Sequence, residues 1–396
     1  MRAPLLLADP GSAPCWIISI GKASHGMARA IVHWLAEHQR EPAGGIIVSA
    51  STGVPPHPAL RAMTGDHPIP GARSLRACSA IADTIARIPP GAIVHVCISG
   101  GASSLAAGPL PAIDRADVTT TFELLLSSGL DIHEMNAVRK RVTRWSAGRL
   151  ALQLVARSLQ VWVVSDVMGD DLGSIASGPC TGDAWTSDRV RAMLSQRGIY
   201  QSLPRSVQLA MAVETPKPAD QWLASITPRI VAANGTALAA AVAAATALGV
   251  RATRMPEPLH GEAAIMGRAI AQATVGPSET PEIRIWGGET TVTMVGQRGI
   301  GGRSQELALA AAEHWHRGGS ALLAAGTDGR DGPTDAAGAL VDAETWKRIV
   351  AAGRDPAIDL AAHDAYAALN TAGALLRTGP TGTNVMDIAF ATTGWG

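Results

Sequence analysis

The sequence predicts an α/β protein with two domains, on three observations. Short apolar runs without charge, such as residues 15–20 and 161–164, have the composition of buried strands in a parallel sheet. Each run leads into a loop of Gly, Ser, Thr or Asp and then into a helical pattern, and both halves of the chain share this design. The chain has 396 residues, too many for one ordinary core, and the proline-rich segment 215–228 marks the domain boundary.

Composition and charge exclude several classes of protein. Lys+Arg and Asp+Glu both number 33, so the balance of charge indicates neither a nucleic-acid partner nor an anionic membrane. No apolar run reaches the roughly 18 residues of a membrane span. The four cysteines lack CxxC spacing, which argues against a zinc site or a disulfide framework. The apolar residues 5–7 are too few for a signal peptide, so we expect a cytoplasmic protein.

The first predicted strand, residues 15–20, leads directly into Gly21, Lys22 and Ala23. Apolar residues then recur at helical spacing between positions 27 and 35. Lys22 is therefore expected at a strand-to-helix turn, beside backbone N–H groups that favour an anion. The P-loop pattern is absent. The alternative is an ordinary surface lysine near a helix start.

Two further loops have the composition of anion cradles. The strand predicted at residues 93–98 opens into a glycine- and serine-rich loop, and backbone N–H groups with hydroxyls can hold a phosphate or a carboxylate. A glycine- and threonine-rich loop at residues 379–384 precedes a final strand at 386–391. The candidate residues in these loops are Ser99, Gly100, Gly101, Ser103, Ser104, Thr383 and Asn384.

Two acidic loops follow predicted buried strands. The first, residues 165–179, carries Asp166, Asp170 and Asp171, whose oxygens could hold a divalent metal at the carboxyl end of a strand. Its alternative is a polar loop in which the Asp side chains cap a helix or form turns. The second loop follows residues 321–325 and carries Asp328 and Asp331, at a spacing that is not that of an EF-hand.

Residues 134–149 form a basic run. On a helix, Asn136, Lys140 and Arg144 would share one face, and clustered Arg and Lys side chains, Arg139 included, can neutralise a phosphate-rich ligand. The alternative is a solvated helix face, the usual explanation of a charge run.

In the second half, a strand at 283–286 runs into Glu289 and Thr290. Gly301 and Gly302 then open a helix that carries Arg303 at its start. The alternative for Arg303 is an ion pair with Glu306 at i,i+3.

Taken together, these motifs resemble the glycerate 2-kinase family, in order and over almost the entire chain. The motifs are GKAS, HPIPG, SGGASSL, HEMNAVRK, SDVMGDD with IASGP, GGETTV, GGRSQELAL, GTDGRDGPTDAAGA and GPTGTNVMD. The resemblance implies an N-terminal domain, residues 1–225, with a Rossmann-like, mostly parallel sheet and flanking helices. It also implies a C-terminal α/β domain, residues 226–396, with a MOFRL region at about 282–391 and an active site in the cleft between the domains.

The resemblance further implies transfer of the γ-phosphoryl group of ATP to the 2-hydroxyl of D-glycerate, giving 2-phosphoglycerate. Lys22 and Arg303 match residues that the family uses as key cations, and Mg²⁺ or another divalent cation would accompany ATP. Expected partners are these small molecules, with neither nucleic acid nor membrane, and a homo-oligomer is left open. The residues expected to contact substrate or phosphate are Ser99, Gly100, Gly101, Ser103, Ser104, Asn136, Arg139, Lys140, Glu289, Thr290, Gly301, Gly302, Thr383 and Asn384. The residues expected to bind metal are Asp166, Asp170, Asp328 and Asp331.

Ser304 and Met386 depart from the family pattern, since both stand where Asn is usual. One alternative function is an NAD(P)-dependent hydroxypyruvate reductase. Against it, no GxGxxG motif follows any strand with an acid about 20 residues further on. The other alternative is a catalytically inactive binding protein. The retention of every charged motif argues against this alternative.

Overall fold

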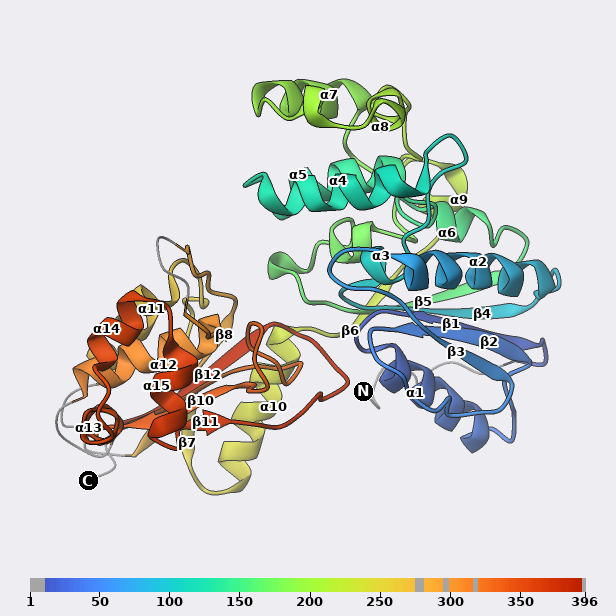
Figure 1. Cartoon of the computed structure of the whole chain (residues 1–396). Helices are drawn as coiled ribbons and strands as arrows, with labels where there is room; N and C mark the ends of the chain where they lie inside the picture. Colours follow the sequence, from blue (N-terminus) through green and yellow to red (C-terminus); the bar gives the residue numbers. More distant parts are fainter. Residues whose placement is uncertain (1–10, 275–280, 295–298, 316–319, 394–396) are drawn as a thin grey trace. The chain divides into compact units, whose positions relative to one another are not determined.

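A computed structural model describes residues 11–274, 281–294, 299–315 and 320–393. It divides into two compact units, Met1–Val231 and Ala232–Gly396, and in the described residues each unit is built on a six-stranded sheet (Figure 1). The apolar residues 5–7 lie outside the described part. No described helix combines the length and the apolar content that crossing a bilayer requires.

The sheet of the first unit has the strand order β3-β2-β1-β4-β5-β6, and the pairs from β3 through β5 are parallel. This is the order of Rossmann-type dinucleotide-binding folds, so the predicted mostly parallel sheet is confirmed. Buried Ile and Val side chains dominate its central strands, as a sheet covered on both faces requires. The strands are β1 (Cys15–Ile20), β2 (Gly44–Ser49), β3 (Leu60–Thr64), β4 (Ile93–Ile98), β5 (Ser158–Val164) and β6 (Arg229–Ala232).

Helices cover both faces of this sheet. Figure 1 shows α1 (Ser24–Glu37) on one face and α2 (Ala72–Arg87) on the other. A further helical layer has an apolar core of its own, around Phe122 and Val138. The remaining helices of the first unit are α3 (Ala102–Leu105), α4 (Arg115–Ser127), α5 (Ile132–Val142), α6 (Arg149–Leu152), α7 (Ser187–Gln196), α8 (Arg205–Ala210) and α9 (Gln221–Ala224), with short 3-10 turns η2 (Met168–Asp170), η3 (Ile175–Ser177) and η4 (Tyr200–Ser202).

The second unit has a mixed sheet with the order β11-β10-β9-β12-β8-β7. Strand β12 runs antiparallel to both β8 and β9, so the ends of β8 and β9 meet the start of β12 at one edge. The strands are β7 (Arg251–Arg254), β8 (Glu282–Gly288), β9 (Ala321–Gly326), β10 (Gly338–Asp342), β11 (Leu375–Leu376) and β12 (Asp387–Thr393). The helices are α10 (Asn234–Ala247), α11 (Ala263–Thr274), α12 (Arg303–His314), α13 (Thr345–Ala351), α14 (Pro356–Ala361) and α15 (Ala365–Thr371).

Candidate functional site

The strand order of the first unit reverses between β1 and β4, which are neighbours in the sheet. In open α/β sheets, ligands bind at this reversal, outside the carboxyl ends of the strands. Ile20 at the end of β1 lies opposite Ile98 at the end of β4. The loops 21–23 and 99–101 therefore leave the sheet side by side, and they form the first candidate site.

Hydrogen bonds join these two loops directly. The backbone N–H of Lys22 donates to the carbonyl of Gly100 at 2.9 Å. The backbone N–H of Ala23 donates to the buried Oγ of Ser99 at 3.0 Å. The backbone of Lys22 is thus fixed between the two strands at the start of α1, and the residue is half-buried.

Two loop glycines allow further side chains to approach Lys22. A Cβ atom on Gly100 would lie 1.6 Å from Oδ2 of Asp166, and one on Gly101 would lie 3.1 Å from the ring of His67 and 3.6 Å from Cγ of Lys22. Gly101 also has φ +83°, a conformation that favours glycine. The structure therefore brings together Lys22, Gly100, Gly101 and Asp166, all predicted site residues. His67 joins them from the HPIPG loop, and no pattern other than that motif indicated it.

The acidic loop after β5 uses its three aspartates differently. Asp166 lies against Gly100, whereas Asp170 has φ +56° and, among the described residues, no hydrogen-bond partner for its carboxylate. Asp171 accepts hydrogen bonds from the backbone of Gly173 at 3.1 Å and from Oγ of Ser174 at 2.6 Å. Burial alone would raise the pKa of Asp171, but these hydrogen bonds outweigh it and hold the pKa below its ordinary value.

The basic run is not a solvated helix face, so that alternative is wrong. Arg139, Lys140 and Arg141 on α5 are all buried. Lys140 Nζ donates to Oδ1 of Asp183 at 3.2 Å, and Arg141 Nη1 donates to Oδ2 at 2.9 Å. Asp183 is fully buried and lies about forty residues away in sequence. The basic run alone therefore could not indicate that a buried carboxylate pairs with its Lys140 and Arg141.

Two other predictions for this helix have different outcomes. Asn136 donates to the carbonyl of Ser174 at 3.0 Å and accepts from Oγ of Ser177 at 2.9 Å, so it holds the acidic loop in place. The predicted helical face through Arg144 is wrong, because α5 ends at Val142 and the next residue is extended. Arg139 packs over the ring of Phe122 at 4.8 Å, and burial lowers its pKa to about 10.

A small pocket of about 240 Å³ lies between α5 and the acidic loop. Asn136 and Lys140 line it from the helix, and Asp171 and Gly173 line it from the loop. A Cβ on Gly173 would lie 3.6 Å from Nζ of Lys140, so the ammonium group lies close to the loop. The pocket thus offers hydrogen-bonding groups to a small polar molecule, with Lys140, which is paired with Asp183, and the carboxylate of Asp171 on opposite elements.

The second candidate site lies in the other unit, at the edge where β8, β9 and β12 meet. Arg303, the first residue of α12, donates from Nε to Oδ2 of Asp387 at 2.5 Å and from Nη2 to Oδ1 at 3.0 Å. Its Nη1 pairs with Glu289. Burial alone would lower the pKa of Arg303, but Asp387 and Glu289 raise it above its ordinary value. The alternative prediction, an ion pair between Arg303 and Glu306, is wrong. Oε2 of Glu306 instead lies 2.9 Å from Nδ1 of His363.

Asp331 caps the start of α12. Its Oδ1 accepts from the backbone N–H of Ser304 at 3.1 Å, and its Oδ2 accepts from that of Gln305 at 2.8 Å. Burial raises the pKa of Asp331 to about 6. Both oxygens therefore satisfy helix N–H groups, which would otherwise lack a partner. Asp328 accepts from the backbone of Arg330 at 3.0 Å.

The remaining predicted residues of this unit surround the same edge. Thr290 is buried just after β8. Gly302 directly precedes α12 and lies so close to Asp331 that a Cβ on this glycine would be 2.3 Å from Cγ of Asp331. The loop before β12 contains Thr383 and Asn384, and Oδ1 of Asn384 accepts from the backbone of Met386 at 3.3 Å. A Cβ on Gly301 would make only ordinary contacts, at 3.4 Å.

Met386 occupies a conformation that suits asparagine better. Its φ is +67°, in the left-handed region where Asn and Gly are favoured, and its side chain is buried. The Asn that is usual at this position would therefore be explained by backbone geometry. In the part of the chain that the structure describes, no cluster of three or more His, Cys, Asp or Glu side chains forms a metal site.

Family comparisons agree with this architecture. Residues 7–212 match the domain of unknown function DUF4147, and residues 282–387 match the MOFRL family. The solved structure of glycerate kinase from Thermotoga maritima superimposes with a TM-score of 0.83 at 34% identity, covering 97% of this chain and 92% of that one.

Curated relatives cover almost the whole chain. Glycerate 2-kinase of Pyrococcus horikoshii is 36% identical, over 95% of this chain and 86% of the relative. D-glycerate 2-kinase of Thermotoga maritima is also 36% identical, over 94% and 89%. A putative hydroxypyruvate reductase of Agrobacterium vitis is 37% identical, over 94% and 86%. With matches of this identity and length, the chain belongs to the glycerate 2-kinase family.

Proposed function

We propose that this protein transfers the γ-phosphoryl group of ATP to the 2-hydroxyl of D-glycerate, giving 2-phosphoglycerate. The observation that carries the proposal is the position of Lys22, bonded through its backbone to the loop of Gly100 where the strand order reverses. That position is where this class of sheet binds ligands. Relatives named glycerate 2-kinase at 36% identity supply the reaction and the acceptor.

The residues at the first site suit phosphoryl transfer. This reaction needs positioning and charge neutralisation more than covalent chemistry from the protein. Lys22 supplies a cation at the start of α1, where backbone N–H groups and the helix dipole also favour phosphate. The backbone N–H groups of Gly100 and Gly101 provide further donors in the neighbouring loop, and the hydroxyls of Ser103 and Ser104 follow on the short helix α3.

The acids after β5 fit a divalent cation of the Mg²⁺ type. Such a cation takes one or two carboxylates and keeps waters and phosphate oxygens as its other ligands, so a cluster of three acids is not required. Asp166 lies against Gly100, and among the described residues the carboxylate of Asp170 has no hydrogen-bond partner. We assign these two as the ligands. When bound, such a cation would offset negative charge on the phosphate groups. Asp331 fits a capping role better, because helix N–H groups occupy both of its oxygens.

The acceptor would occupy the small pocket between α5 and the acidic loop. Its volume of about 240 Å³ suits a three-carbon acid, and Lys140 can face the carboxylate while Asn136 keeps the loop in place. In the second unit, Arg303 is the proposed phosphate-binding cation, and Asp387 sets the plane of its guanidinium. We also propose that Glu289 and Thr290, near this arginine, contact substrate or phosphate.

The test compares two reactions with one purified sample. ATP, Mg²⁺ and D-glycerate should give ADP at a rate far above the rate without glycerate. NADH or NADPH with hydroxypyruvate should give no oxidation, although a relative carries the name putative hydroxypyruvate reductase. Oxidation of the nicotinamide cofactor without ATP turnover would reverse the assignment.

A further inference from the structure

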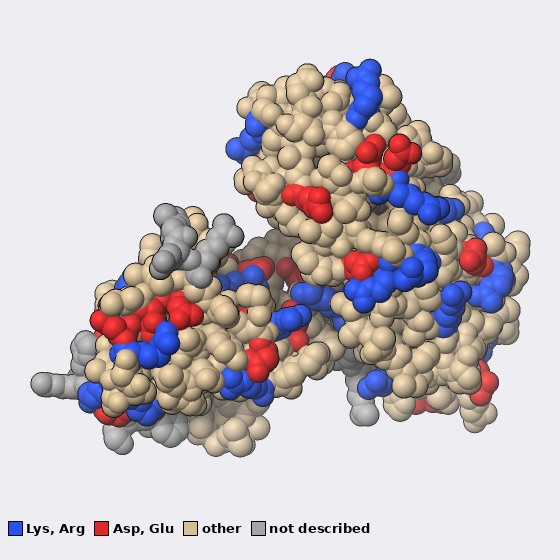
Figure 2. Space-filling model, in the orientation of Figure 1, with Lys and Arg blue, Asp and Glu red and all other residues tan. Residues whose placement is uncertain are grey.

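Four arginines line one pocket of the first unit, outside the site described above. The pocket has a volume of about 550 Å³, and Asp83 is its one acidic lining residue. Figure 2 shows basic side chains gathered over the region of α2. The four are Arg61, Arg76, Arg115 and Arg144.

These arginines come from four separate segments. Arg61 lies on the outermost strand β3, Arg76 on α2, Arg115 at the start of α4, and Arg144 just after the end of α5. All four are exposed. Because they are far apart in sequence, the fold and not one charged helix concentrates the positive charge.

The guanidinium groups lack acidic partners. Within the described residues, none of the four forms an ion pair or a side-chain hydrogen bond. Arg73, on the same helix as Arg76, instead donates from Nε to Asp66 at 2.6 Å. Arg144 packs over the ring of Trp145 at 4.7 Å, a cation–π contact and not an ion pair. Four like charges around one hollow repel each other, and an anion would relieve that repulsion.

Backbone contacts fix the walls of this pocket. The N–H of Arg144 donates to the carbonyl of Gly108 at 2.8 Å, and the N–H of Leu110 donates to that of Val142 at 3.1 Å. A Cβ on Gly108 would lie 2.3 Å from Sγ of Cys78 on α2. The segment around Gly108 is therefore held between α2 and the residues that carry Arg144. The same contacts fix the backbone of Arg144.

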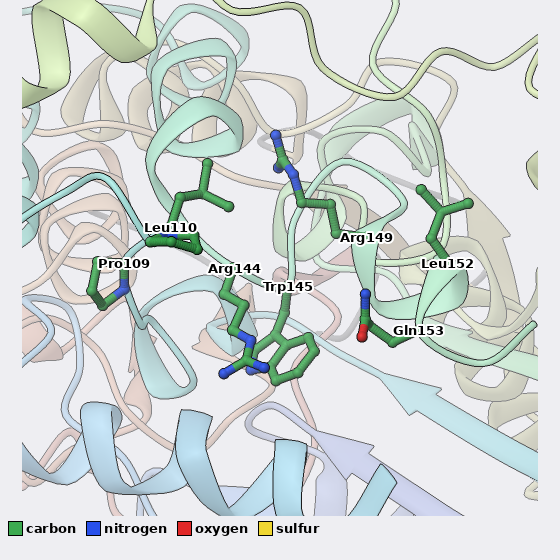
Figure 3. Close-up of a pocket in the computed structure, with 8 residues that line it drawn as sticks. Pro109, Leu110, Arg144, Trp145, Arg149, Leu152 and Gln153 are labelled. Atoms are coloured by element: carbon green, nitrogen blue, oxygen red, sulfur yellow. The ribbon is translucent and has the colours of Figure 1, made fainter. Parts of the chain in front are cut away.

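An apolar pocket adjoins the arginine pocket and shares Pro109 and Arg144 with it. It measures about 470 Å³, and Figure 3 shows Leu110, Trp145 and Leu152 around it. Arg144 thus lines both pockets, and the second is mostly apolar although Arg149 also lines it. Together they offer room for a charged group and for a less polar body attached to it.

We propose that the arginine pocket binds a small molecule that carries two or more phosphate groups. Planar guanidinium forks match phosphate oxygens two at a time, and four positive groups against one negative favour a multiply charged anion. The volume is that of a small-molecule site, and the balanced charge of the whole chain argues against a nucleic-acid strand. No lining residue belongs to the proposed kinase site, so this binding is separate from the proposed function.

The test is calorimetric titration with inorganic tripolyphosphate. Because the proposed kinase site also holds phosphates, the titrations use the wild-type protein and Lys22→Ala. We expect both to bind the probe, and we expect the double variant Arg76→Gln/Arg115→Gln in the Lys22→Ala background to bind at least tenfold more weakly. Arg87→Gln is the matched control, since Arg87 is exposed on the same helix but does not line the pocket.

Higher salt should weaken the binding in every variant that retains the four arginines. Circular dichroism and melting curves check the fold, and the single variant Arg61→Gln on the edge strand gives an independent reading. Equal affinity in the double variant and its parent, or no binding to Lys22→Ala, would overturn the proposal.

Discussion

Arg303 and Asp387 form a two-point ion pair in the second unit, with Nε–Oδ2 at 2.5 Å and Nη2–Oδ1 at 3.0 Å. The pair joins the start of α12 to the start of β12, and Asp387 is almost completely buried. Two parallel hydrogen bonds fix the plane of a guanidinium as well as its position. Asp387, together with Glu289 at Nη1, therefore determines which N–H groups of Arg303 remain for a ligand.

Removal of this carboxylate should reduce both activity and stability. We expect Asp387→Ala to lower kcat/KM by about 10–100-fold, the range for residues that orient a functional side chain. Unfolding free energy should fall by roughly 1–3 kcal/mol, less than for a fully buried pair because the Arg303 side chain is 35% exposed. Steady-state kinetics and urea denaturation measure the two effects. Glu289→Gln, which removes the more exposed partner, is the control and should change both less.

The two proposed cations should each be required for turnover. Lys22→Ala and Arg303→Ala are expected to stay folded and to lose on the order of 10²–10⁵ in kcat/KM, as for charge-stabilising cations in other phosphoryl transfers. Arg303→Lys should restore little, because an ammonium group cannot form the two-point pair. The measurement is steady-state kinetics with melting curves as folding controls. Near-wild-type kcat/KM in either alanine variant would remove that residue from the mechanism.

The assignment of metal ligands predicts a change in metal dependence. Asp166→Asn and Asp170→Asn should raise the Mg²⁺ concentration that gives half of maximal activity, because each removes a negative oxygen ligand. Titration of activity with Mg²⁺ at saturating ATP measures this shift. Asp188→Asn, at an exposed aspartate of α7 outside the proposed site, is the matched control. If both loop variants keep the wild-type metal dependence, these aspartates do not bind the metal.

The buried ion cluster of α5 predicts a loss of stability in acid. Burial alone would raise the pKa of Asp183, but Lys140 and Arg141 outweigh it and hold the pKa below its ordinary value. A carboxylate with a lowered folded-state pKa stabilises the fold above its unfolded pKa of about 4, and this contribution disappears as the pH falls through the folded-state value.

The variant Asp183→Asn should therefore unfold more easily than wild type at pH 7, by about 3–5 kcal/mol, because it leaves two buried cations unpaired. The difference should shrink as the pH falls below about 4. Urea denaturation of both proteins across this pH range measures it. A stability difference that is the same at every pH would show that the ionised carboxylate of Asp183 is not what holds the cluster together.

Apolar patterns in the sequence predicted the central strands of the first sheet but not its edge. Strands β1 and β4 begin and end at the predicted residues, because each is an uncharged, mostly apolar run that stops at a glycine or serine loop. The β3 strand and α2 were not predicted. The short sequence of β3 lies at the edge of the sheet and includes the exposed Arg61, so it lacks a clear apolar pattern.

Partners that are distant in sequence limited what could be predicted of the sites. The position of Lys22 followed from the strand and helix on either side of it. The partner of Arg303 could not be found in this way, since Asp387 lies 84 positions away and only the pairing of β12 brings it close. Asp183 likewise neutralises Lys140 through tertiary structure, and a helical pattern alone favoured a solvated face.

The most direct test of the proposed function is the position of the new phosphate ester. Purified protein is incubated with ATP, Mg²⁺ and D-glycerate, and the product is assigned by phosphorus–proton NMR correlation. The account predicts 2-phosphoglycerate, with the phosphorus coupled to the proton on carbon 2, and formation of the same product at a rate lower by about 10²–10⁵-fold with Lys22→Ala. A phosphorus coupled to the carbon 3 protons, or no phosphorylated glycerate at all, would contradict it.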